Sequence, residues 1–215
     1  MSSATYQQSS AARDEPIAQD PENNYLWRYP RQRLEAEPMR DAVLFVSGRL
    51  KGGSPGRHPF PELDENGAYQ FTQHRPFVED YDHEHRSVYL PSRRLARHPY
   101  MANFDGPDTN ECAANRQVST VPLQSLFWMN SDFIQDNAQS FAQKLLSWGG
   151  NTEERINRAY QIALARSPDA AEIKELSSYL AVYQSKLDES AESELRSWTS
   201  LCRVLLASNE FIYID

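Results

Sequence analysis

Cysteine is scarce in this chain of 215 residues, which contains only Cys112 and Cys202. Two cysteines cannot form a disulfide framework, and neither a CxxC nor a CxxCH spacing occurs. The attachment motif of a c-type haem is therefore absent, and we expect no cofactor in this chain. Two buried free thiols are the expected state of the cysteines, with one disulfide as the alternative.

A long hydrophobic run is also missing. No stretch approaches the roughly 20 apolar residues that span a membrane, and the first residues lack the basic and apolar parts of a secretory signal. The net charge is -8. An acidic chain is a poor match for the phosphate backbone of nucleic acids. Taken alone, the sequence predicts a cytoplasmic protein that has no membrane span and no nucleic-acid partner.

Motifs of nucleophilic or nucleotide chemistry are absent as well. The sequence has no GxSxG elbow, no P-loop and no GxGxxG stretch. Glu35 and Glu37 are two residues apart, so on a helix they face different ways, which is poor geometry for a paired acid and base. The sequence therefore shows no recognisable catalytic motif and leaves the catalytic residues unknown, and it favours a chain that is not an enzyme on its own.

Histidine is confined to one part of the chain, because all five histidines lie between residues 58 and 98. On a strand, His83 and His85 would point to the same face and could form half of a metal site. The spacing specifies no third ligand, so we favour a polar loop and predict no metal site.

Apolar residues at helical spacing are what the sequence has in abundance. Residues 1–24 are polar and lack such a period, which predicts a flexible N-terminal arm. Residues 25–215 are predicted to form a single, mainly helical domain. Pro38 is tolerated only in a first helical turn, so the first helix should begin near Glu35, and Gly48 should end it.

The rest of the pattern defines one irregular segment and several further helices. Residues 51–82 are rich in Gly and Pro and predict a long loop, and the alternation in residues 83–91 predicts one short strand. Further helices are predicted to begin at Pro122, at a cap in residues 130–132 with Gln135 placed as in a capping box, at a Thr152 cap and at residues 167–169, and a last one carries Trp198 and Leu205. The expected fold is a mainly α domain interrupted by a long irregular segment, with at most one or two short strands.

Charged residues crowd the start of the first helix, namely Arg33, Glu35, Glu37, Arg40 and Asp41. We interpret them as a structural polar network that joins this helix to the irregular segment. Arg33 or Arg40 is expected to pair with acidic groups of the helix or with Asp105 or Asp108, and their guanidinium groups should be buried. Removing one partner of such a buried pair typically costs about 3–5 kcal/mol.

Several stretches occur in an order that resembles a known family. They are NYLWRYPRQRLEAEPMRDAVLFVSGRL, HRSVYLP, NFDGPD, NRQVSTVPLQSLFWMNSDF, RINRAYQIALARSPDAAEI and CRVLLASNEFIYID. Together they resemble the planctomycete-specific C-terminal domain of unknown function, PSD-one type, which is found in large cytochrome c-like multidomain proteins. The resemblance implies a mainly helical fold, a place in the periplasm or cell envelope, and upstream domains of a parent protein as partners. It also implies that a c-type haem belongs to a separate domain, and that this chain is truncated at its N-terminal side.

Two functions are compatible with these observations. The first is a structural or interaction module at the C-terminus of a large envelope-associated protein. The alternative is part of a ligand-binding or hydrolytic site for saccharides, with Arg86, Asp105, Asp108 and Arg116 lining a pocket against Trp27. The two differ in whether these side chains converge on an open cleft or pair among themselves.

Overall fold

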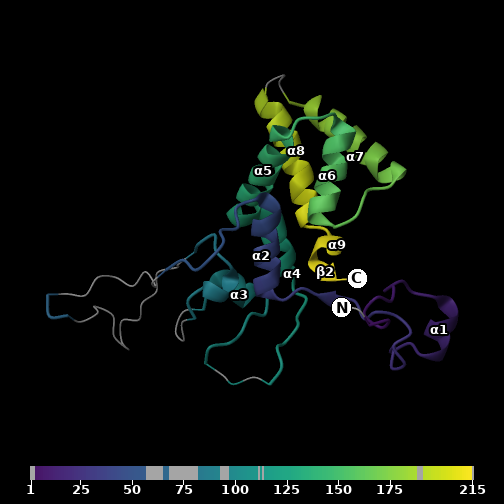
Figure 1. The fold of residues 1–215 in the computed structure, drawn as a ribbon, viewed down its shortest axis with the longest axis vertical. Helices are drawn as coiled ribbons and strands as arrows, with labels where there is room; N and C mark the ends of the chain where they lie inside the picture. The colour runs from purple at the N-terminus through teal and green to yellow at the C-terminus, as the bar shows by residue number, and fades with distance from the viewer. Residues whose placement is uncertain are drawn as a thin grey trace.

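The computed structural model describes residues 3–56, 65–67, 82–92, 97–110, 112, 114–187 and 191–214. Helices dominate this part of the chain, which confirms the predicted mainly α fold (Figure 1). The elements are α1 Asp14–Gln19, β1 Gln32–Arg33, α2 Ala36–Ser47, the 3-10 helix η1 Ser87–Tyr89, α3 Pro99–Asn103, α4 Pro122–Asn130, α5 Asp132–Ser147, α6 Thr152–Ala163, α7 Ala170–Gln184, α8 Ala191–Leu206, α9 Asn209–Ile212 and β2 Tyr213–Ile214.

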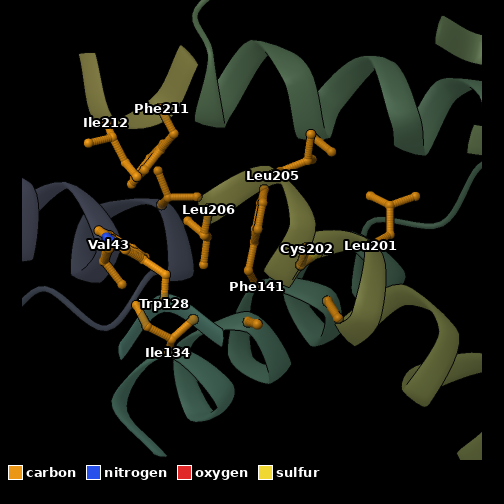
Figure 2. Packing of buried hydrophobic residues seen from close by; sticks show 14 of the residues in the cluster. Val43, Trp128, Ile134, Phe141, Leu201, Cys202, Leu205, Leu206, Phe211 and Ile212 are labelled. Carbon is orange, nitrogen blue, oxygen red and sulfur yellow. The ribbon is translucent and has the colours of Figure 1, made fainter. Parts of the chain in front are cut away.

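The hydrophobic core is centred on the pair α5 and α8, which lie side by side (Figure 1). Ile134 and Phe141 of α5 pack toward Leu201 and Leu206 of α8 in one buried cluster, and Val43 of α2 joins them (Figure 2). Fully burying one such side chain stabilises a fold by about 1.5–3 kcal/mol relative to exposing it. Helix α2 therefore has a fixed position, from which its other faces can present side chains.

The ends of α2 follow the sequence prediction. Glu35 is the N-cap, which places Pro38 in the first turn, where its missing N–H costs no hydrogen bond. Gly48 ends the helix in the left-handed region at φ 79°, a conformation that glycine adopts without steric cost.

The caps of the later helices differ from the prediction in detail. Asn151, not Thr152, caps α6, because its side chain accepts the N–H of Glu154 while the Glu154 carboxylate accepts the N–H of Asn151. Ser131 alone caps α5, and Gln135 donates to the carbonyl of Met129 instead of completing a capping box. The positions of both helices are as predicted.

The predicted strand in residues 83–91 is wrong. This segment forms an isolated bridge between Lys51 and His85 and then η1. Its polar groups are bound by side chains of α2, as described below, so the alternation of residue types does not reflect pairing with a strand. The two-stranded antiparallel sheet is β1–β2 instead, in the register Gln32↔Ile214 and Arg33↔Tyr213, and it joins the C-terminal end to the entry of α2.

The N-terminal segment that we predicted to be a flexible arm contains α1, a helix with no buried residue. This segment contacts the residues that follow it: Trp27 donates from Nε1 to the carbonyl of Asp20 at 2.9 Å, and Arg13 donates to the carbonyl of Trp27 at 3.1 Å. In Figure 1 it lies apart from the helices of the core.

Both cysteines are free. The expectation of a buried thiol holds for Cys202, and it is wrong for Cys112, which is exposed in the polar segment before α4. Burial raises the pKa of the Cys202 thiol. None of the helices within the described residues is long and apolar enough to cross a membrane.

Candidate functional site

A cleft of about 730 Å³ lies along the face of α2 that does not enter the core. Its other walls are residues 86–92, which contain η1, and residues 97–109, which contain α3, together with Arg116. The volume falls within the range of about 300–1,000 Å³ that is typical of ligand pockets. We regard this cleft as the candidate binding site.

Helical spacing explains which α2 side chains reach the cleft. Pro38, Ala42 and Phe45 are separated by four and three residues, so they share a face, and Glu37 and Asp41 lie beside them at a spacing of four. The opposite face carries the buried residues Met39, Val43 and Val46. Phe45 is 65 % exposed, so the helix offers the cleft a large apolar surface.

The facing walls are also largely apolar, with Val88, Leu90 and Pro91 on one side and Met101 and Pro107 on the other. Val88 is 70 % exposed although it lies on a hydrophobic wall. The apolar lining was missed in the sequence, because Phe45 and Val88 lie outside the apolar stripes that indicate a core.

Arg116 lines the cleft and binds two carboxylates at the N-terminal end of α2. It donates to both oxygens of Glu37 at 2.6 and 2.9 Å and to Glu35 at 3.0 Å. Burial raises the pKa of Glu37, but the hydrogen bonds from Arg116 and the backbone outweigh it and hold this pKa below its ordinary value. Glu37 is thus an ionised group engaged with Arg116, and it is a poor candidate for a proton donor at neutral pH.

Asp41 holds the wall that carries η1. Its Oδ1 accepts the backbone N–H of Ser87 at 2.7 Å, and its Oδ2 lies 3.5 Å from Nε of Arg86. Asp41 is only 16 % exposed, whereas the Arg86 side chain is 68 % exposed and lines the cleft.

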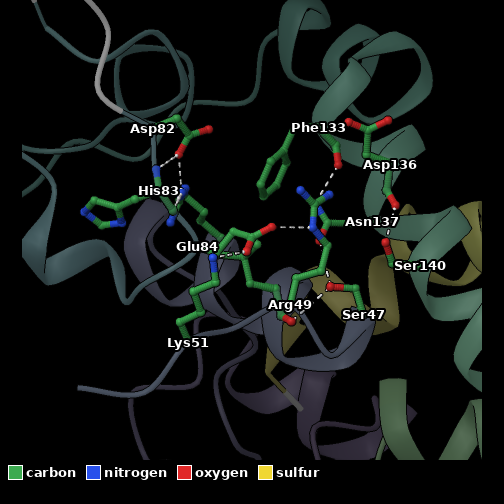
Figure 3. Close-up of polar contacts among 12 residues, drawn as sticks. Ser47, Arg49, Lys51, Asp82, His83, Glu84, Phe133, Asp136, Asn137 and Ser140 are labelled. Carbon is green, nitrogen blue, oxygen red and sulfur yellow. Dashed lines mark hydrogen bonds and ion pairs between the residues drawn. The ribbon is translucent and has the colours of Figure 1, made fainter. Parts of the chain in front are cut away.

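Contacts of Arg40 and of Glu84 also hold the segment that leads into this wall. Arg40 lies buried under it and binds Asp82 and the carbonyl of His83. Glu84 lies between Arg49, at 2.8 Å, and Lys51, at 2.9 Å (Figure 3). The hydrogen bonds from Lys51 and Arg49 lower the pKa of Glu84. Charged groups that follow α2 and precede η1 thus set the shape of the cleft.

A separate network lies at the entry of α2. Arg33 donates to Asp105 at 2.7 Å and to Gln124 Oε1 at 2.9 Å, and its side chain is 8 % exposed. Asp105 also accepts the N–H and the hydroxyl of Ser119 at 2.8 and 2.7 Å. Burial raises the pKa of Asp105, but the hydrogen bonds from Ser119 and Arg33 outweigh burial and hold this pKa below its ordinary value.

A glycine allows the turn after Asp105 to approach α3. A Cβ on Gly106 would lie 2.9 Å from the carbonyl oxygen of Met101, which leaves no room for a side chain. Arg97, which lines the cleft, donates to the carbonyl of Gly106. This close approach fixes the α3 wall.

The structure divides the four candidate ligand-binding residues. Arg86 and Arg116 line the cleft, while Asp105 belongs to the Arg33 network and Asp108 accepts the N–H of Asn110 at 2.8 Å in its own turn. Trp27 lies in the N-terminal segment between Arg13 and Arg28 and does not line the cleft. Of the residues expected in the polar network, Glu35, Glu37 and Asp41 line the cleft, and Arg33 and Arg40 lie beside it.

No group of three or more His, Cys, Asp or Glu side chains in the described ranges could hold a metal ion. The rings of His83 and His85 lie 5.6 Å apart, and His98 lines the cleft. His58 and His74 lie outside the described residues.

Comparison with known proteins identifies the family of the chain. The model of the family PSD1, described as "Protein of unknown function (DUF1553)", matches residues 1–180. No curated protein and no solved structure matches the chain. Because the match covers most of its length, this chain belongs to the PSD1 family of proteins of unknown function.

Proposed function

We propose that this chain is a binding and interaction module without catalysis of its own, and that the cleft beside α2 holds its ligand or partner. The observation that carries the proposal is how the carboxylates around the cleft are engaged. Glu37 is bound by Arg116, and Asp41 accepts the N–H of Ser87, so both serve to shape an apolar site. Such a site favours recognition over proton transfer.

The wider setting follows from the resemblance of the sequence. We propose that the module belongs to the C-terminal part of a large envelope-associated protein, and that upstream domains of that protein are its partners. In this setting a c-type haem would belong to a separate domain. The exposed apolar lining of the cleft supports a role in binding, since a hydrophobic surface in a concave site gains free energy when it is covered.

Saccharide hydrolysis has less support than binding. A glycosidase needs a carboxylic acid with a raised pKa beside a second carboxylate. The pKa of Glu37 is lowered, and Asp105 and Asp108 do not line the cleft. Phe45 is the aromatic side chain that the described lining offers for stacking against a sugar ring.

A ligand screen tests the proposed function. We expect amphipathic small molecules to raise the melting temperature of the wild-type chain, and Val88→Glu to abolish the effect, because it places a charge on the apolar wall. Val182→Glu is the matched control, since Val182 is 55 % exposed on α7 and does not line the cleft. Equal responses of the two variants would refute the cleft as the binding site.

A further inference from the structure

The charged groups around the cleft are not equally available to a ligand. Three carboxylates (Glu35, Glu37 and Asp41) and three guanidinium groups (Arg86, Arg97 and Arg116) line it, together with His98. Their formal charges balance, so recognition depends on which group can exchange its present contact for a contact with a ligand.

Arg116 and Arg97 are committed to the protein. Arg116 makes three hydrogen bonds to Glu35 and Glu37, all of 3.0 Å or less, and a ligand would have to compete with two carboxylates for it. Arg97 donates to the carbonyl of Gly106, and this contact fixes the turn against α3. Turning either guanidinium toward a ligand would break contacts that shape the cleft.

Arg86 is in a different position. Its contact with Asp41 measures 3.5 Å, which is the outer limit of a hydrogen bond, and its side chain is 68 % exposed. Asp41 accepts the N–H of Ser87 at 2.7 Å through its other carboxylate oxygen, a hydrogen bond in which the Arg86 side chain takes no part. The guanidinium can therefore turn to a ligand at little cost, and it lies next to Val88 on the same wall.

We infer that the cleft recognises an apolar molecule that carries one carboxylate, with Arg86 binding the carboxylate and Phe45 and Val88 covering the apolar body. The inference rests on the proposed function and adds the chemical class of the ligand. A guanidinium binds a carboxylate through two parallel N–H···O bonds, which Asp41 at 3.5 Å does not use. The three carboxylates of the lining are balanced by three guanidinium groups, and two of these, on Arg97 and Arg116, stay in place when Arg86 turns to the ligand, so the lining as a whole carries no net negative charge against it.

Three probes that differ only in their polar group test the inference: phenylbutyrate, phenylbutyramide and phenylbutylamine. Isothermal titration of the wild-type chain should give phenylbutyrate about tenfold tighter binding than the amide, the effect expected of one charge-assisted contact. Arg86→Gln should remove this preference, and Arg86→Glu should reverse it in favour of the amine. Arg196→Gln, an exposed arginine of α8 away from the cleft, should leave the preference unchanged.

The remaining outcomes separate the inference from the proposed function. If the three probes bind equally and Val88→Glu abolishes all three, the cleft binds ligands but does not select carboxylates, so the inference fails alone. If phenylbutyrate binds tightest and Arg86→Gln has no effect, the assignment of Arg86 is wrong. If no probe binds the wild-type chain, the inference is refuted, and the ligand screen with Val88→Glu decides the proposed function independently.

Discussion

Arg40 keeps a guanidinium group in the interior, where its side chain is 2 % exposed. Its donors reach Asp82, the carbonyls of His83 and His85, and the hydroxyl of Ser87. The same group lies 5.7 Å from the centre of the Phe133 ring. A buried charge is tolerated when its hydrogen bonds are satisfied in this way, so Arg40 attaches the η1 wall to α2.

Replacing Arg40 should therefore cost stability. We expect Arg40→Ala to lower the free energy of unfolding by about 3 kcal/mol, the low end for breaking a buried pair, because Asp82 is 57 % exposed and can be hydrated. Arg40→Lys should recover only part of the loss, since an ammonium lacks the planar fork that reaches several acceptors. Urea denaturation measures both values.

Arg196→Ala is the matched control for this measurement, because Arg196 forms an exposed pair with Glu192 on α8. Its cost should stay within about 1 kcal/mol, as for other surface pairs. If Arg40→Ala costs no more than this control, the buried guanidinium does not hold the wall.

The pairs of Arg33 and Arg40 differ in how far the sequence predicts them. Arg33 with Asp105 was among the expected pairings, since both lie beside segments with clear turn or helix signals. Arg40 with Asp82 was not, because Asp82 lies at the end of a long loop whose path no local pattern specifies. Charge at the start of a helix predicts that partners exist, while the fold of the loops selects them.

Arg166 connects the start of α7 to α9. Arg166, between α6 and α7, donates to both oxygens of Glu172 at 2.8 and 2.7 Å and to Glu210 of α9 at 2.8 Å. Glu172 also completes the capping box of α7 with Asp169. The hydrogen bonds from Arg166, with a smaller opposing effect of burial, lower the pKa of Glu172 from 4.5 to about 2.

This junction should make the stability of the chain depend on pH in the acidic range. Because the pKa of Glu172 is lower in the folded state, its ionised form stabilises the fold above pH 4.5, and the contribution is lost as the pH falls from 4.5 to about 2. Glu172→Gln should be less stable than the wild type at pH 7, and the difference should shrink toward pH 2. Thermal unfolding across this range measures it.

Glu175→Gln removes an exposed carboxylate three residues further along α7 and serves as the control. Its difference from the wild type should be small at every pH. A constant difference between Glu172→Gln and the wild type from pH 7 to pH 2 would contradict the role of the ionised carboxylate.

Whole helices were predicted well where a long apolar period and a cap coincide, as in α5, α6 and α7. The short helices α3 and α9 were missed, because five and four residues are too few to display a period. The strand expected near residue 88 was wrong for another reason. Alternating residue types favour a strand only if a neighbouring strand pairs with it, and here Asp41 and Arg40 of α2 bind the backbone and side chains.

The cleft could not be predicted from the sequence, because it is a property of the whole molecule. Its lining comes from residues 35–50, 86–92 and 97–109 and from Arg116, and no periodicity relates these segments to one another. Arg86 and Arg116 were selected as candidates from the resemblance, and the structure brings both to the cleft. Asp105 and Asp108 were selected on the same grounds and lie outside it: Asp105 binds Arg33 and Ser119, and Asp108 accepts the N–H of Asn110 in its own turn, as carboxylates in turns often do.

An exposed apolar stripe runs along α4 and the segment before it. It consists of Val118, Val121, Leu123, Leu126 and Met129, which are all exposed, while Gln124 and Trp128 of the same helix are buried. Leu123, Leu126 and Met129 follow one another at a spacing of three, so they share one face of α4. Exposed apolar patches of this kind promote association.

Polar substitution of the stripe should therefore change the behaviour of the whole molecule without changing its fold. We expect Leu123→Glu with Leu126→Glu to raise the soluble concentration and to reduce self-association in sedimentation velocity, with a melting temperature close to that of the wild type, because neither side chain belongs to the core.

Val182→Glu with Val204→Glu adds the same charge at exposed apolar sites of α7 and α8, so it separates the effect of the stripe from that of net charge. Equal gains in the two double variants would mean that charge alone governs solubility. A large drop in the melting temperature of the stripe variant would mean that α4 needs its apolar face for folding. A gain confined to the stripe variant would identify α4 as the surface through which the chain associates.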